Sequence, residues 1–271
     1  MKNYKHFKVE LKESIVQVSF NRPDKANALV LEAWEEMQVI FEEIDQNPVI
    51  RVAILSGEGK HFCAGIDLSL LMGLQKYNQI DCEGRKREGL RQFILKLQNT
   101  ITSIQKCRKP VLAAIHNGCI GGAVDIITAC DMRYATKEAY FTIKEVDMGL
   151  VADIGTLQRL PKIIPPGMVA EMAFTGRKVY GPEAKSIGLV NHVYQDKSKM
   201  MEEVFKIAKT IAAKSPLVIR GTKEIIEYSR NHSIEESLNY MSVWNAAMLM
   251  SNDLMESFQA TVEKRAANYK D

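Results

Sequence analysis

The sequence predicts an α/β protein with a helical C-terminal region, and three observations carry that prediction. Over roughly the first 195 residues, short apolar runs typical of buried strands alternate with amphipathic helix patterns. From residue 196 onward the pattern is helical almost throughout. With 46% hydrophobic and 25% charged residues among 271, the composition is that of an ordinary globular protein. We therefore expect an α/β core over 1–195 and a helical region over 196–271.

The first predicted elements are a β-hairpin and a long helix. The stretches HFKVEL and IVQVSF alternate apolar and polar residues around a KES turn, which predicts two antiparallel strands. Pro23 interrupts the strand pattern, and an amphipathic helix is expected from Ala28 to Asp45. Its apolar side carries Leu29, Trp34, Met37, Ile40, Phe41 and Ile44.

Two further apolar runs predict buried strands of one sheet. IRVAILSG and KPVLAAIHNG both end in a glycine turn, and a helix pattern reaching Cys107 lies between them after the polar stretch 75–89. A strand, a helix and a second strand in that order are typical of a βαβ unit. In the C-terminal region we expect helix breaks near Ser215, His232 and Ser251.

The C-terminal helices carry more apolar side chains than one buried helix face needs. These side chains can pack on the core of their own chain or on neighbouring subunits, and the pattern leaves both alternatives open. The residues concerned are Met241, Trp244, Met248, Leu249, Met250, Leu254, Met255 and Phe258.

Composition argues against several classes of partner. The 36 basic and 33 acidic residues give a net charge of +3, which predicts no nucleic-acid partner. No apolar run approaches the roughly 20 residues that span a bilayer, so no membrane partner is expected. Five cysteines without a CxxC pair and five scattered histidines indicate a reducing compartment and no metal site. Because the N-terminus shows no leader pattern, the chain is predicted to be cytoplasmic.

Two glycine-bearing turns can carry chemistry. GEGKHFCAGIDL and HNGCIGGAVDII each join a strand to a helix, where backbone N–H groups and the helix dipole favour negative charge. Two such turns can direct two N–H donors at one oxygen and so form an oxyanion hole. Alternatively, the glycines only allow tight turns. Neither stretch matches a nucleotide-phosphate motif.

Three acids stand in apolar surroundings, which is costly for a buried carboxylate. Each has an ordinary explanation: Asp125 can interact with a helix dipole, Asp153 can be a helix N-cap, and Glu145 can lie on the surface. In combination, paired carboxylates in surroundings of low polarity beside an oxyanion hole suit proton transfer next to a thioester carbonyl. We then expect like charges to raise the pKa of at least one of them.

The combined motifs resemble the enoyl-CoA hydratase/isomerase, or crotonase, superfamily. HFCAGIDL, HNGCIGGAVDIITACDMRYAT and EVDMGLVADIGTLQRLPK carry the resemblance, which covers nearly the whole chain. Within the superfamily the sequence is similar to the delta(3,5)-delta(2,4)-dienoyl-CoA isomerases, since most hydratases have small residues where Asp153 stands. The resemblance implies a crotonase-like fold of stacked ββα turns with a C-terminal helical trimerisation region. It also implies a homotrimer or a dimer of trimers.

The resemblance assigns roles to individual residues. It implies that the N–H groups of Ala64 and Gly122 form the oxyanion hole and that Asp125, Glu145 and Asp153 are catalytic. It further implies that coenzyme A is contacted by Lys25, Ala26, Gly65, Ile66, Asp67, Leu68 and Lys264.

The implied reaction is the isomerisation of 3,5-dienoyl-CoA to 2,4-dienoyl-CoA in fatty acid β-oxidation, with no metal or redox cofactor. Glu145 would take the C2 proton and Asp153 would protonate C6, with the reverse assignment open, while Asp125 orients its neighbours. Two alternatives remain: an enoyl-CoA hydratase that uses Asp125 and Glu145, and a non-catalytic acyl-CoA-binding protein on the same fold.

Overall fold

The computed structural model describes residues 2–271, and its main sheet has six strands in the order β1-β2-β3-β4-β6-β9. The predicted hairpin is confirmed, because β1 and β2 pair antiparallel with Lys12 opposite Ile15. The later strands all join in parallel register. The six strands are β1 (Phe7–Lys12), β2 (Ile15–Phe20), β3 (Val52–Gly57), β4 (Val111–Ile115), β6 (Met132–Thr136) and β9 (His192–Tyr194).

A second, smaller sheet has the order β5-β7-β8, with β5 (Gly118–Ile120), β7 (Tyr140–Thr142) and β8 (Val179–Tyr180). The chain passes from β4 of the large sheet to β5 of the small one within two residues, and Asn117 takes a φ of 47° there. These strands are not predicted from the sequence, because two or three residues are too few to show an alternating pattern.

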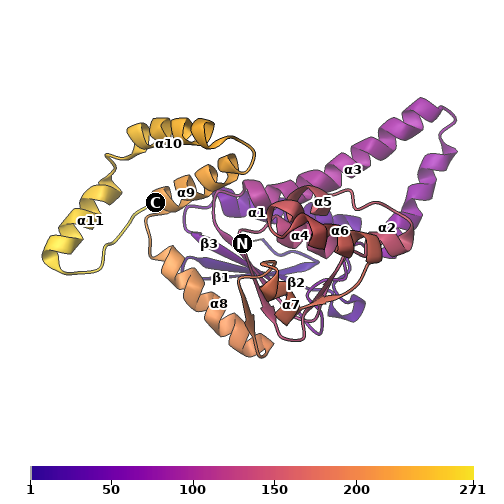
Figure 1. Ribbon diagram of the computed structural model, residues 1–271, viewed down its shortest axis with the longest axis horizontal. Helices are drawn as coiled ribbons and strands as arrows, with labels where there is room; N and C mark the ends of the chain where they lie inside the picture. The colour runs from indigo at the N-terminus through magenta and orange to yellow at the C-terminus, as the bar shows by residue number, and fades with distance from the viewer. Residues whose placement is uncertain (1) are drawn as a thin grey trace.

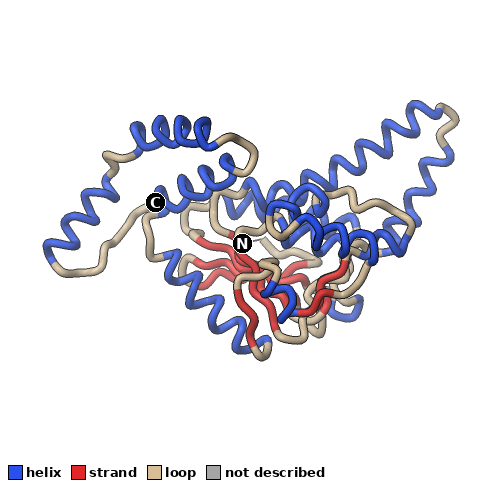
Figure 2. Tube along the Cα trace, viewed as in Figure 1, coloured by secondary structure: helices blue, strands red, loops and turns tan. Residues whose placement is uncertain are grey.

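Helices cover both faces of the main sheet (Figures 1 and 2). Helix α8 (Lys197–Ala212) packs Met200 and Val204 against Val52 and Ile54 of β3. Helices α1 (Leu31–Gln46), α3 (Glu83–Lys106) and α4 (Gly122–Thr128) lie in the core on the other face. Helix α8 therefore packs on the sheet of the α/β core, although it lies beyond residue 195 in the sequence.

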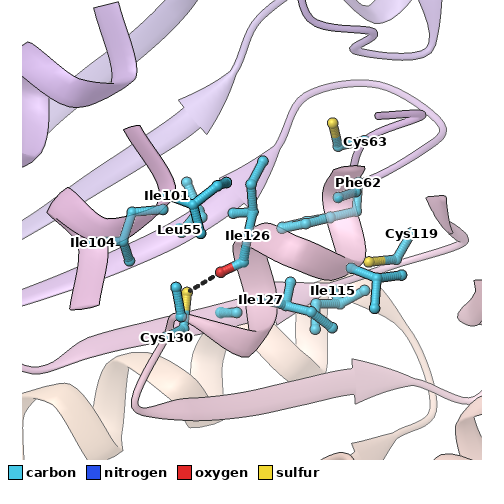
Figure 3. Packing of buried hydrophobic residues seen from close by; sticks show 14 of the residues in the cluster. Leu55, Phe62, Cys63, Ile101, Ile104, Ile115, Cys119, Ile126, Ile127 and Cys130 are labelled. Carbon is cyan, nitrogen blue, oxygen red and sulfur yellow. Dashed lines mark hydrogen bonds between the residues drawn. The ribbon is translucent and has the colours of Figure 1, made fainter. Parts of the chain in front are cut away.

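Helix α4 lies inside the main core. Figure 3 shows its Ile126 and Ile127 surrounded by Leu55 of β3, Ile101 of α3 and Ile115 of β4. Every residue of α4 is buried, and an aspartate stands among them. The fold therefore places a carboxylate where water cannot solvate it, and protein groups must compensate it.

Helix α1 begins at Leu31, later than the predicted Ala28, because the residues before it have another use. Ala26 and Asn27 both take positive φ values, and the Leu29 N–H donates to the carbonyl of Gly65 at 2.8 Å. This pairing fixes the start of α1 beside the first glycine turn. All six predicted apolar side chains of this segment are buried, as expected.

The three C-terminal helices begin at the predicted breaks, and each is capped by a serine that accepts a backbone N–H. Helix α10 packs on α9, whereas α11 has no extensive packing with another element in the described chain. Figure 1 shows both extending away from the sheet. Met250 is 82% exposed and Phe258 60% exposed, so their own core does not cover them. The helices are α9 (Pro216–Ser229), α10 (Ile234–Met248) and α11 (Asn252–Glu263).

Short elements complete the chain around the glycine turns. The α-helices among them are α2 (Leu68–Gly73), α5 (Thr156–Arg159), α6 (Pro166–Thr175) and α7 (Gly181–Ser186). The 3-10 helices are η1 (Pro23–Lys25), η2 (Leu74–Gln79), η3 (Lys144–Met148) and η4 (Leu160–Lys162). Within residues 2–271, no helix combines the length and the apolar character needed to cross a bilayer.

Candidate active site

The first glycine turn has one amide that stays free for a ligand. The Ala64 N–H donates to the carbonyl of Ala26 at 3.0 Å, and the Asp67 N–H donates to the carbonyl of Leu29 at 3.0 Å. The Gly65 N–H lies 3.4 Å from the sulfur of Cys63. The Ile66 N–H has no acceptor within the described residues, because the pairing of its neighbours with Leu29 turns it to the opposite side.

The assignment of the first oxyanion donor to Ala64 is therefore wrong. Its amide is already engaged by Ala26, so it cannot also bind a substrate oxygen. Ile66, which was expected only to contact coenzyme A, presents its amide instead, and it lines a pocket together with Gly122.

The second glycine turn starts α4 at Gly122, whose N–H is the first of the helix and has no acceptor in residues 2–271. The two turns touch, because a Cβ at Gly65 would lie 2.9 Å from the Gly122 nitrogen. Gly121 has a φ of 54°, and a Cβ there would lie 3.1 Å from a carboxylate oxygen of Glu145. Two free amides and one carboxylate thus meet at this junction.

A pocket of about 340 Å³ opens at the junction. Of the expected coenzyme A contacts, Lys25, Ile66, Asp67 and Leu68 line it. The backbones of Ala26 and Gly65 hold its wall instead, since their carbonyls accept from Ala64 and Leu29.

The side chain of Asp67 has a structural task at the pocket wall. Its carboxylate accepts from the N–H of Ser69 at 3.0 Å as the N-cap of α2, and it pairs with Arg22 at 3.0 Å. The hydrogen bonds from Ser69 hold the pKa of Asp67 below its usual range. The carboxylate of Asp67 is therefore already bonded within the protein, so a ligand would contact the fixed backbone of this residue.

Lys264 does not reach the pocket of its own chain. It ends α11 with a φ of 53°, and Figure 1 shows α11 at the opposite end of the molecule from α2. A contact between Lys264 and a bound ligand would require a second copy of the chain.

Asp125 is fully buried and joins two segments of the site. One carboxylate oxygen accepts from the Thr156 N–H at 2.5 Å, and the other has no partner in the structure. This bond caps α5, which has Gly155 rather than a side chain at its N-cap position. The simple N-cap explanation for Asp153 is therefore wrong.

Burial is the main cause of the unusual acidity at this site. It raises the pKa of Asp125 to about 7, with a further contribution from the charge of Glu145, while the Thr156 bonds oppose the rise. Burial also raises the pKa of Glu145, and the charge of Asp153 adds to it. The pKa of Asp153 rises because part of this side chain is covered, although the rest is exposed. The sequence predicts that like charges raise the pKa of at least one acid. They do contribute for Asp125 and Glu145, but burial is the larger cause.

The structure brings the segments of the three acids together, because Asp125 bonds to the turn that follows Asp153 and Glu145 lies against the glycine before helix α4. The charges of Glu145 and Asp153 accordingly add to the raised pKa of Asp125. Glu145 lies against the turn with the free amides, and Asp153 is the member that reaches solvent. Such an arrangement can remove a proton beside a carbonyl and deliver another proton farther along a bound chain.

No local sequence pattern points to the residues that hold the acids in place. Thr156 supplies the N–H to Asp125, and Gln98 of α3 donates to the carbonyl of Asp153 at 2.6 Å. These contacts join segments that are 31 and 55 residues apart, and local sequence patterns carry no signal for them.

Comparisons with known proteins agree with the fold and identify the family. The family model described as "Enoyl-CoA hydratase/isomerase" matches residues 10–271. A structure of enoyl-CoA hydratase from Bacillus anthracis superposes with a TM-score of 0.88 at 30% identity, covering 98% of this chain and 99% of that one. The chain therefore belongs to the enoyl-CoA hydratase/isomerase family and has the crotonase fold.

The curated relatives point to one branch of that family. The chain is 46% identical to the peroxisomal delta(3,5)-delta(2,4)-dienoyl-CoA isomerase of Arabidopsis thaliana, covering 99% of this chain and 98% of the relative. It is also 46% identical to the mitochondrial protein of that name from Mus musculus, covering 97% and 81%. These similarities identify an enzyme of the isomerase type. Since the relatives are named as peroxisomal and mitochondrial, the cytoplasmic location stays a prediction.

The raised pKa of Asp125 predicts how the stability of the folded protein depends on pH. The folded carboxyl binds its proton up to about pH 7, whereas an ordinary aspartate loses it near 3.8. The stability that this proton contributes is complete below the lower value and is lost as the pH rises through the higher one. Asp125→Asn cannot ionise but still accepts from Thr156. Relative to wild type, its free energy of unfolding should gain on the order of 2 kcal/mol between pH 5 and pH 8.

Urea denaturation at the two pH values, at one protein concentration, measures this difference. Parallel pH dependence of the two proteins would show that Asp125 titrates normally in the fold.

Proposed function

We propose that the protein isomerises 3,5-dienoyl-CoA to 2,4-dienoyl-CoA during fatty acid oxidation. The observation that carries the proposal is the third carboxylate, Asp153, in one cluster with Asp125 and Glu145. The isomerisation removes a proton at C2 and adds one at C6, so it needs acid–base groups at two separate places. The names of the similar dienoyl-CoA isomerases support the same substrate class.

In the proposed reaction, the thioester oxygen binds between the N–H groups of Ile66 and Gly122. Glu145, which lies against Gly121, takes the C2 proton because C2 is the carbon next to that carbonyl. The electron pair left at C2 is shared with the adjacent thioester oxygen, where the two amides stabilise the negative charge, and in the other direction it spreads along the diene to C6.

Asp153 then delivers a proton to C6, and the double bonds move to the 2,4 positions. One proton leaves the substrate and one enters it, so the net charge of the acids is unchanged over the turnover. Because Asp153 is exposed, it can regain its proton from water. Asp125 holds the Thr156 end of the loop and, with a pKa of about 7, is available as a hydrogen-bond donor to its neighbours.

Coenzyme A enters as part of the substrate, and this acid–base chemistry uses no metal or redox cofactor. Lys25 and Lys144 line the pocket and supply positive charge for the phosphates of coenzyme A. Lys264 would reach these phosphates only from a neighbouring subunit.

We propose a homotrimer or a dimer of trimers in solution. The supporting observation is the uncovered apolar surface of α10, α11 and the link between them, which includes Leu249, Met250, Met255 and Phe258. A stable monomer in sedimentation at micromolar concentration would contradict this assembly.

Hydration of an enoyl-CoA is the second candidate function. Glu145 lines the pocket with the two amides, Asp125 follows Gly122 in the same helix, and the two acids could activate water. Solved structures of similar fold are described as hydratases. This alternative gives Asp153 no role, so that residue separates the two functions.

Asp153→Asn should reduce the turnover of 3,5-dienoyl-CoA by about 100-fold or more, the usual loss for a missing general acid or base. The amide keeps the size of the side chain but cannot exchange a proton. Any hydration of crotonyl-CoA should survive. The rise of the conjugated 2,4-dienoyl absorbance measures the reaction. Asp81→Asn removes an exposed acid outside the cluster and serves as the matched control. An unchanged rate in the Asp153 variant would exclude the three-acid mechanism.

Gly122→Pro should lower kcat by about 10²–10³ because it deletes one donor to the thioester oxygen. Proline is tolerated at the first position of a helix, so α4 should still form. Gly122→Ala is the control, because its Cβ meets the Trp34 ring at 3.3 Å while its N–H remains. Equal rates for the two variants would show that steric crowding, and not a missing donor, explains the loss.

A further inference from the structure

The loop that carries Asp153 is held from behind by Arg159. This side chain of α5 is half-buried and donates from Nε to the Gln105 Oε1 at 2.7 Å and from Nη2 to the Thr102 Oγ1 at 3.2 Å. Its Nη1 lies 3.5 Å from the carbonyl oxygen of Ile154, the residue after Asp153. The guanidinium group therefore connects the acid-bearing loop with helix α3.

One face of α3 provides the anchor for this contact. Gln98, Thr102 and Gln105 are spaced by four and three residues, so their side chains lie on the same side of the helix. Gln98 donates to the carbonyl of Asp153 at 2.6 Å, which fixes the peptide immediately before the one that faces Arg159. Helix α3 thus orients two consecutive carbonyls of the loop. Gln98 binds the carbonyl of Asp153 directly, and Arg159 connects the carbonyl of Ile154 to the helix.

Gly155 shows how closely the guanidinium approaches the loop. Its φ of 140° is strained for residues with a side chain, and a Cβ at this position would clash with Nη1 of Arg159. The next residue, Thr156, donates its N–H to Asp125. Arg159 thus lies under a turn whose two ends carry Asp153 and the donor to Asp125.

Arg159 has no carboxylate partner within 4.0 Å among the ion pairs of the described chain, which is unusual for a half-buried guanidinium. Burial lowers the pKa of Arg159, and the charge of Asp125 opposes that shift. Its hydrogen bonds go to the amide oxygen of Gln105, the hydroxyl of Thr102 and the carbonyl of Ile154. Since none of these acceptors is charged, the contacts orient the loop relative to α3 and do not neutralise the guanidinium.

We infer that Arg159 is a positioning residue that holds the turn 153–156 so that the Asp153 carboxyl and the Thr156 N–H face the acid cluster together. This inference rests on the proposed role of Asp153 in protonating C6. Removal of the guanidinium would let the turn shift, and a displacement of about 1 Å at a reacting group can cost 10²-fold in rate.

A cavity of about 370 Å³ behind the turn makes a direct test possible. Arg159 lines it together with Gln98, Thr102, Gln105 and Gly155. In Arg159→Ala, free guanidinium ion can enter this space and meet the same acceptors.

The experiment measures kcat and KM for 3,5-dienoyl-CoA in Arg159→Ala with and without added guanidinium. We expect kcat to fall at least tenfold with KM nearly unchanged, and tens of millimolar guanidinium chloride to restore it several-fold. Sodium chloride at the same ionic strength should not restore it. Lys162→Ala is the matched control, because Lys162 lines the same cavity but bonds to Arg230 and Asn231 instead of the loop.

Several results would overturn the inference. They are an unchanged kcat, a loss confined to KM, equal recovery in sodium chloride, or full activity in Arg159→Lys, which keeps the charge without the planar geometry. If Arg159→Ala does not fold, Gln98→Ala removes the other donor to the loop and must show the same loss of kcat. An inactive wild-type protein would contradict the proposed function itself, whereas an active wild type with an unaffected variant contradicts only the role of Arg159.

Discussion

The Thr156 N–H donates at 2.5 Å to a carboxylate, Asp125, that has no exposed surface, and the geometry of the site depends on this bond. A buried carboxylate without compensation is expensive, and here the amide at the start of α5 compensates one of its oxygens. In return, the bond fixes the beginning of α5 and the turn that carries Asp153. Helix α4 contributes the Gly122 amide at its first residue and Asp125 within its first turn, so one buried helix sets the oxyanion junction and the acid cluster together.

Not every buried carboxylate oxygen in the cluster has a hydrogen-bond partner, and an acid with an unpaired oxygen can exchange a proton. The second oxygen of Asp125 and one oxygen of Glu145 are buried without a partner, and burial raises the pKa of each acid in the cluster. A fully satisfied carboxylate would stay ionised and could not supply a proton near neutral pH. The site therefore gives up some folding stability to keep protons available, which is a common property of catalytic carboxylates.

The sequence was a good guide wherever a local pattern decides the structure. The hairpin, β3, β4 and the serine-capped starts of α9, α10 and α11 follow from alternation and capping residues. The segments that carry the three acids lie in contact with one another, while the catalytic roles of these acids stay a prediction. The assignment of Ala64 failed because the direction of an amide depends on its partners, and here the pairing of Leu29 with the first glycine turn decides it. The placement of Lys264 and the packing of α8 against the sheet likewise depend on tertiary arrangement, for which a helix pattern carries no information.

The central claim is that two different carboxylates act at the two ends of the dienyl system, with Glu145 at C2 and the exposed Asp153 at C6. Turnover of 3,5-dienoyl-CoA in D₂O, followed by mass spectrometry and NMR of the product, tests it most directly. If Asp153 exchanges with solvent before it protonates the substrate, the 2,4-dienoyl-CoA should carry one deuterium at C6. Retention of the original C2 proton at C6 would show that a single carboxylate carries it from one carbon to the other, and would contradict the account.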